Sequence, residues 1–97
     1  MTKQEALARL RAHEADLRGM GIERLSIFGS TARGEAREDS DLDLAVQFRN
    51  GLKFSWGWYW MEHEIAAMLG VPVDMVSEPT DAPRLQAQID RDRVHVF

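Results

Sequence analysis

The chain has 97 residues, of which 12 are Lys or Arg and 16 are Asp or Glu, so its formal net charge is −4 at pH 7. This length predicts a single domain, residues 1–97, with a modest core and no room for a second lobe. The acidic balance argues against broad nucleic-acid binding, which depends on clustered Lys and Arg, and so against a template-directed polymerase. The absence of cysteine excludes disulfides and thiolate metal sites and fits a reducing cytoplasm.

The N-terminal segment is charged and periodic, and it predicts a helix over residues 3–18. Thr2 followed by Glu5 has the pattern of a capping box, and leucines continue at helical spacing. Gly19 or Gly21 is expected to end the helix. The segment has neither the pattern of a signal peptide nor the length of an apolar membrane span, so we expect no membrane association.

The next element is an apolar strand over residues 22–28, which ends at Gly29. Glycine accepts positive φ and allows backbone N–H groups to approach a ligand. Ser30 then offers a hydroxyl and an amide. A short helix over residues 31–36 would point its unpaired N–H groups at the same place. An anion fits at this turn, and a triphosphate is the anion that we expect.

Two arginines, Arg33 and Arg37, follow the turn closely. Their guanidinium groups could contact phosphate oxygens. The alternative is that they pair at the surface with Glu35, Glu38 or Asp39. The sequence leaves both arrangements open, and Arg33 is the better candidate for a phosphate contact.

Residues 41–48 alternate between polar and apolar side chains, which predicts a half-buried strand with Asp41 and Asp43 on its polar face. Residues two apart on a strand are separated by about 6.5–7 Å along its axis and point the same way. Two such carboxylates can reach a pair of Mg²⁺ ions about 3.5–4 Å apart. Without a cation the pair is unfavourable, because neighbouring like charges repel. An isolated Asp-x-Asp is more often a solvated face, but next to the turn it indicates phosphate and metal binding.

Five of the eight aromatic residues of the chain fall within residues 54–60. A helix is expected over residues 55–69, with an apolar stripe that begins at Trp58 and faces the core. Trp56 and Trp60 lie off this stripe, and they could bind a partner, close the edge of the core or stack on a base. We favour a partner-binding surface, because large apolar side chains left over after the core is assigned often mark an interaction site.

A third strand is expected over residues 71–76, with Asp74 on the face opposite its apolar residues. If this strand lies beside the strand of the Asp-x-Asp pair, Asp74 completes a site of three carboxylates. Glu78 is a weaker candidate, because it falls after the strand. A helix that starts near Pro83 and a short edge strand over residues 94–97 complete the chain.

These segments together resemble a known signature. Residues 29–34 read Gly-Ser-Thr-Ala-Arg-Gly, and residues 40–44 read Ser-Asp-Leu-Asp-Leu. This order resembles the DNA polymerase beta superfamily of nucleotidyltransferases, and more narrowly the minimal nucleotidyltransferases (MNT) that are paired with HEPN toxins. The superfamily also has a third acidic residue on a neighbouring strand, which Asp74 matches. The fold implied is an α/β (α+β) domain, a small mixed β-sheet flanked by helices, with the metal site opposite most of the helices.

The reaction implied is nucleotidyl transfer from ATP to a hydroxyl with release of pyrophosphate. Asp41, Asp43 and Asp74 would be the catalytic residues and would hold two Mg²⁺ ions. Gly29, Ser30 and Arg33 would bind the nucleotide. Antitoxins of this family adenylylate a tyrosine on a HEPN ribonuclease toxin, so the resemblance implies a HEPN-type toxin as partner.

Two other functions stay open at this point. The chain could neutralise a toxin by contact alone, although an intact set of three carboxylates counts against this. It could instead modify a small molecule, as aminoglycoside nucleotidyltransferases do, although those enzymes use a further domain to hold the acceptor.

Overall fold

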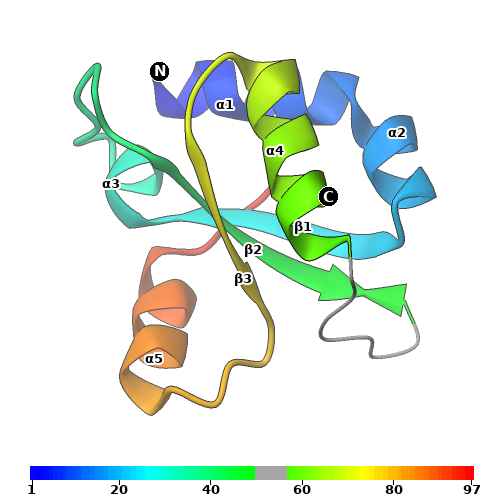
Figure 1. Ribbon diagram of the computed structural model, residues 1–97. Coiled ribbons are helices and arrows are strands. Elements are labelled where there is room, and N and C mark those ends of the chain that lie inside the picture. Colours follow the sequence, from blue (N-terminus) through cyan, green and yellow to red (C-terminus); the bar gives the residue numbers. More distant parts are fainter. Residues whose placement is uncertain (50–56) are drawn as a thin grey trace.

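A mixed sheet organises the residues that the structure describes, which are residues 1–49 and 57–97 of a computed structural model. The elements in chain order are α1 (Lys3–Ala12), α2 (Glu14–Gly19), β1 (Ile22–Phe28), α3 (Gly29–Ala32), β2 (Leu42–Phe48), α4 (Trp58–Leu69), β3 (Val73–Ser77), α5 (Pro83–Asp92) and β4 (Val94–His95). Within this part of the chain, four strands pair in the order β3-β2-β1-β4, and helices pack on the sheet (Figure 1). The predicted α/β fold is therefore confirmed.

The pairing of β2 brings distant parts of the sequence side by side. β2 is antiparallel to β1 and parallel to β3. Parallel neighbours need a crossover, and α4 lies in the connection between β2 and β3 (Figure 1). In this register the Cα of Asp43 is paired with Phe28 on one side and with Asp74 on the other. The strand of Asp74 therefore lies beside the strand of Asp43, as the sequence analysis required.

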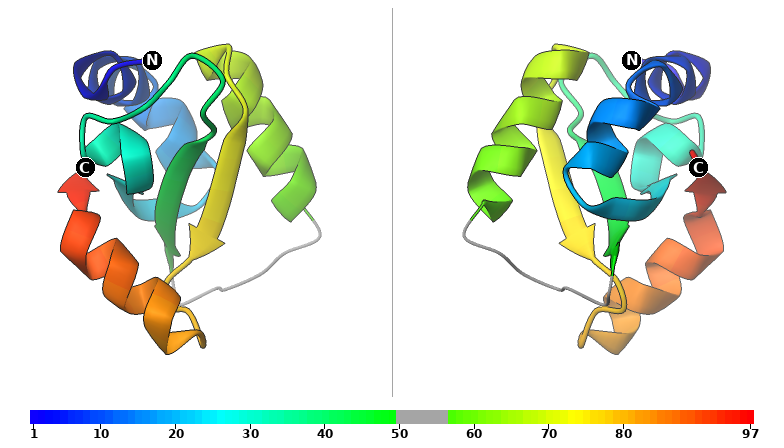
Figure 2. Two further views of the ribbon diagram at one scale, coloured as in Figure 1. Left: turned by 90° about the vertical axis from the view of Figure 1, so that its left-hand side faces the viewer. Right: turned by 90° about the vertical axis from the view of Figure 1, so that its right-hand side faces the viewer.

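One face of the sheet forms the larger core against α1, α2 and α4 (Figure 2). The strand residues Leu42, Leu44 and Val46 are buried on this face. The buried residues of α1, α2 and α4 in the same cluster are Ala6, Leu10, Leu17, Met61, Ile65 and Leu69. The spacing of the last three confirms the predicted apolar stripe of α4.

The opposite face is covered in part by α5. Ile89 of this helix is fully buried in a small cluster with Phe28 and Ala45. Because side chains alternate along a strand, Asp43 shares this face with Ala45. The sheet therefore separates Asp43 from the larger core, as predicted.

The N-terminal helix is interrupted, and here the expectation of one helix over residues 3–18 is wrong. α1 ends at Ala12, and α2 begins at Glu14. The N–H of His13 donates to the carbonyl of Leu10, three residues back. Such a tightened turn interrupts the regular helix, and it occurs without the proline or glycine that would reveal it in a sequence.

The segment after β1 also differs from the expected helix over residues 31–36. α3 begins at Gly29, because the N–H of Arg33 donates to the carbonyl of Gly29 at 3.1 Å. The helix is thus joined directly to the end of β1. The expected start of the aromatic helix at residue 55, and Trp56 with it, lie outside the described residues.

Candidate active site

Gly29, at the junction of β1 and α3, is in direct contact with the acidic site. Its φ is +73°, a left-handed conformation that favours glycine. A Cβ built at this position would lie 2.2 Å from Oδ2 of Asp43. The carboxylate of Asp43 therefore lies against the backbone of the turn, in space that only a glycine leaves free.

Ser30 follows in the first turn of α3. The N–H of Arg33 donates to the carbonyl of Gly29, and the first N–H groups of a helix have no carbonyl acceptor within the helix. Ser30 is half-buried, and Thr31 is buried. N–H groups of this kind favour a bound anion. The turn thus places hydrogen-bond donors beside the carboxylate of Asp43.

The three predicted acidic residues lie near the same end of β2 and β3. Asp43 and Asp74 are paired across the two parallel strands, whose neighbouring backbones are about 4.8 Å apart. Asp41 stands immediately before β2. Burial raises the pKa of Asp43, the negative charges of Asp74 and Asp41 raise it further, and Arg33 opposes the shift. The protein therefore holds negative charges together at a cost in free energy unless a cation is present.

The donor set of this site fits a hard divalent cation. Within the described residues, no three Asp, Glu or His side chains are already gathered tightly enough to enclose an ion. Mg²⁺ does not need such an enclosure, because it is usually held by one or two carboxylates together with substrate phosphates and water. Carboxylates paired across two strands, next to a turn rich in N–H donors, match that mode of binding.

Arg33 lies beside this site but is engaged by two carboxylates. Its Nε donates to Glu35 at 3.1 Å, and its Nη1 donates to Asp92 at 2.7 Å. The pair with Glu35 is one that the sequence analysis kept open. Asp92 was missed, because it lies 59 residues away in the chain. Its position three residues after the buried Ile89 places it on the inner side of α5, and this spacing could have indicated a buried carboxylate.

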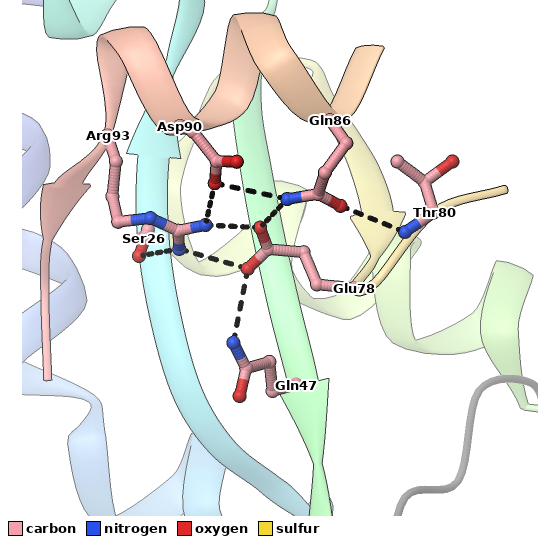
Figure 3. Close-up of polar contacts among 7 residues, drawn as sticks. All are labelled: Ser26, Gln47, Glu78, Thr80, Gln86, Asp90 and Arg93. Carbon is pink, nitrogen blue, oxygen red and sulfur yellow. Dashed lines mark hydrogen bonds and ion pairs between the residues drawn. The ribbon is translucent and has the colours of Figure 1, made fainter. Parts of the chain in front are cut away.

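Glu78, the weaker candidate for the third carboxylate, is used in a buried ion pair. Arg93 donates to both carboxylate oxygens of Glu78 and, at 3.0 Å, to Oγ of Ser26 (Figure 3). Gln86 and Gln47 also donate to Glu78. Burial alone would raise the pKa of Glu78, but these hydrogen bonds and the charge of Arg93 lower it overall. Glu78 therefore fixes α5 to the sheet and is not free to bind a metal.

We expect Glu78→Gln to destabilise the protein by about 3 kcal/mol at neutral pH, because it leaves Arg93 without its buried partner. Since folding lowers the pKa of Glu78, its stabilisation is present above the ordinary pKa of 4.5 and is lost as the pH falls through the lower folded value. Urea unfolding of wild type and Glu78→Gln between pH 3 and 7 measures the free energy of unfolding of each protein. The two free energies should become equal at acidic pH. Asp90→Asn is the matched control, because Asp90 also pairs with Arg93 but is 60% exposed.

The aromatic residues of α4 divide into buried and exposed ones. Trp58 packs edge-on against Phe48, with ring centroids 5.9 Å apart, whereas Tyr59 is 77% and Trp60 is 58% exposed. Phe48 is five residues along β2 from Asp43, which is about 17 Å. α4 also packs on the face of the sheet opposite Asp43, and this position does not favour base stacking by Trp60. It is consistent with a surface for a partner.

None of the helices in the described ranges combines the length and the hydrophobicity that a bilayer crossing requires.

Comparisons with known families, sequences and structures agree on one family. Residues 17–97 match the family described as Polymerase beta, Nucleotidyltransferase. Protein adenylyltransferase MntA of Thermococcus cleftensis is 35% identical over 100 aligned residues, covering 99% of this chain and 97% of the relative. A solved structure of a proposed minimal nucleotidyltransferase superposes with a TM-score of 0.78 at 41% identity, covering 97% of this chain and 95% of that one.

A second solved structure shares the fold at lower identity. It is a complex of a tri-AMPylated HEPN toxin from Shewanella oneidensis with an MNT antitoxin. The TM-score is 0.62 at 17% identity, with 90% of this chain and 71% of that chain covered. The match over residues 17–97 and the identity along nearly the whole chain show that this protein belongs to the polymerase beta family of nucleotidyltransferases, within the group of minimal nucleotidyltransferases.

Proposed function

We propose that this protein is an adenylyltransferase that moves AMP from ATP to a tyrosine hydroxyl of a HEPN-type ribonuclease toxin, and so acts as an antitoxin. The observation that carries the proposal is the pairing of Asp43 with Asp74 beside the backbone of Gly29. The name of the Thermococcus relative supports the reaction. The HEPN toxin in the Shewanella complex supports the partner.

The carboxylates would share the chemical work. The acceptor oxygen forms a bond to the α-phosphorus, the bond to pyrophosphate breaks, and the hydroxyl proton passes to Asp74. Asp41, Asp43 and Asp74 would hold two Mg²⁺ ions, which neutralise charge on the triphosphate when bound. The raised pKa of Asp43 is consistent with a site built for cations.

The turn would hold the nucleotide in line with the acceptor. Gly29 and Ser30 would donate backbone N–H groups to the outer phosphates, and the hydroxyl of Ser30 would add a further hydrogen bond. Arg33, which carries a full positive charge beside Asp43, would contact the same phosphates. We expect no direct contact with nucleic acid, because the chain carries a net charge of −4. A cytoplasmic location stays a prediction from the cysteine-free sequence.

Intact-mass analysis of a HEPN-type partner after incubation with this protein, ATP and Mg²⁺ tests the proposal. We expect a mass increase of one or more adenylyl groups, mapped by peptide sequencing to tyrosine. The same incubation with Asp41→Asn/Asp43→Asn serves as control and should leave the mass unchanged. If that variant silenced the toxin as well as wild type does, the protein would be an antitoxin that works by contact alone.

Trp60, an exposed tryptophan of α4, would contact the partner. We expect Trp60→Ala to weaken partner binding by about 2 kcal/mol, because a large aromatic side chain at an interface often dominates its energy. ATP binding should stay at the wild-type level, since α4 packs on the face of the sheet opposite Asp43. A binding titration with the partner, alongside one with ATP, separates the two effects. If Trp60→Ala lost ATP binding, base stacking by Trp60 would be supported instead. If Trp60→Ala modified the partner as wild type does, Trp60 would not be part of the partner-binding surface.

The same role is predicted for Trp56, which lies outside the described residues. The double change Trp56→Ala/Trp60→Ala should therefore weaken partner binding further than Trp60→Ala alone. Tyr59→Phe is the matched control on the exposed side of α4, because it removes only a hydroxyl from a side chain that is 77% exposed.

A further inference from the structure

Asp92, the last residue of α5, is a buried carboxylate that lies outside the sequence motif. Its side chain is only 3% exposed. It accepts hydrogen bonds from Nη1 of Arg33 at 2.7 Å and from Nε of Arg91 at 3.1 Å. A carboxylate at such a position is unfavourable unless it is paired. Arg91 is 68% exposed and adjacent in sequence, so the pair with Arg33 is the one that joins two distant elements.

The end of α5, which carries this carboxylate, is held on the sheet by contacts on both sides of Asp92. The next residue, Arg93, is tied to Glu78 and to Ser26 of β1 (Figure 3). One helical turn earlier, Ile89 is fully buried against the sheet. Asp92 is therefore held between a buried apolar contact and a buried ion pair, and it has little freedom to move with Arg33.

Arg33 in turn lies at the candidate active site. It is the residue that ends α3, and its backbone N–H donates to the carbonyl of Gly29, the residue that lies against the carboxylate of Asp43. Glu35 and Asp92 occupy Nε and Nη1 of its guanidinium group. Within residues 1–49 and 57–97, Nη2 of Arg33 donates to no acceptor. The guanidinium group of Arg33 therefore keeps N–H donors for a further anionic acceptor.

We propose that Asp92 is a positioning residue, which holds the guanidinium group of Arg33 in the orientation that binds the triphosphate. This inference rests on the proposed function, because it assumes that Arg33 contacts the nucleotide. An arginine side chain loses rotamer freedom when it binds a phosphate, and a side chain that is already held loses less. α5 would thus contribute to nucleotide binding without touching the nucleotide.

The test compares Asp92→Asn with Asp90→Asn, the same chemical change two residues earlier on the same helix. Asp90 is 60% exposed and does not contact Arg33. For Asp92→Asn we expect the KM for ATP to rise about tenfold, with kcat changed less than about twofold. ATP binding, measured by calorimetric titration, should weaken by the same factor. A purely structural role would instead lower the melting temperature and the active fraction, and would leave the KM unchanged.

A double-mutant cycle with Arg33→Ala tests whether Asp92 affects ATP binding through Arg33. In the Arg33→Ala background, Asp92→Asn should raise the KM no further, because the group that it positions is gone. Equal additional effects in both backgrounds would overturn the inference. So would equal KM values for Asp92→Asn and Asp90→Asn in an otherwise active protein, and the proposed function would still stand. A wild-type protein that neither binds ATP nor modifies the partner would overturn both.

If Asp92→Asn does not fold, Asp92→Glu decides the question, because it keeps the charge and moves the carboxylate by one methylene. We expect its KM for ATP to rise about threefold with an unchanged kcat. A wild-type KM in this variant would overturn the inference.

Discussion

Replacing Asp41 and Asp43 together by asparagine is expected to abolish transfer and to stabilise the metal-free protein. A metal ion contributes several kcal/mol to the stabilisation of charge in the transition state, which corresponds to a loss of about 10³-fold or more in rate. The raised pKa of Asp43 has burial as its main cause and the charges of Asp74 and Asp41 as the next. Asparagine keeps the shape of the side chain and removes this repulsion, so the free energy of unfolding should rise by about 0.5–1 kcal/mol.

Thermal melts with and without Mg²⁺ and a non-hydrolysable ATP analogue measure both parts of this prediction. Wild type should gain several degrees from the ligands together, because binding to the folded state alone stabilises it. The double variant should start from a higher melting temperature and gain much less. Asp39→Asn is the matched control, because Asp39 is exposed and lies just before the motif. Equal ligand-induced shifts in wild type and double variant would rule out metal binding at these two aspartates.

The parts of the site that could be predicted from the sequence are those in which local pattern and geometry coincide. Alternation along residues 41–48 placed Asp43 on the face opposite the larger core, because a strand has a period of two. The pairing of Asp43 with Asp74 could be stated only as a condition, since no local pattern fixes which strands are neighbours. The structure meets that condition through a parallel pairing.

The parts that escaped prediction depend on contacts between distant residues. Arg33 and Asp92 are 59 residues apart, and Arg93 reaches Ser26 across 67 residues. In the sequence Arg33, Asp92 and Arg93 each resemble an ordinary exposed charge, because charged residues are usually exposed. Only the packing of α5 on the sheet brings them to their partners and buries Asp92.

The break at His13 escaped prediction for a different reason. A shift from a bond four residues back to one three residues back leaves the apolar spacing almost unchanged. The periodicity of leucines therefore continues across the interruption, and it suggests one helix where there are two.

Gly29→Ala, which adds only a methyl group, is expected to lower the rate of transfer strongly. In Gly29→Ala the new Cβ would lie 2.2 Å from Oδ2 of Asp43, so the carboxylate or the turn must move. The substitution also forces alanine into a left-handed conformation, at a cost of about 1–2 kcal/mol. A displacement of about 1 Å in the groups that position the triphosphate can lower the rate of transfer about 10²-fold. Valine at this position should be at least as harmful, because it is larger.

Gly34→Ala is the control that separates the clash with Asp43 from the strain of a left-handed backbone. Gly34 has nearly the same φ, +75°, but a Cβ there would meet nothing within 4 Å. This control should therefore lose about 1–2 kcal/mol of stability and keep its rate of transfer, whereas Gly29→Ala should lose both. Urea unfolding gives the first quantity, and intact-mass analysis of the partner over time gives the second. If Gly29→Ala and Gly34→Ala transferred AMP at the same rate, the contact between Gly29 and Asp43 would have no part in the reaction, and the phosphates would have to bind elsewhere on the protein.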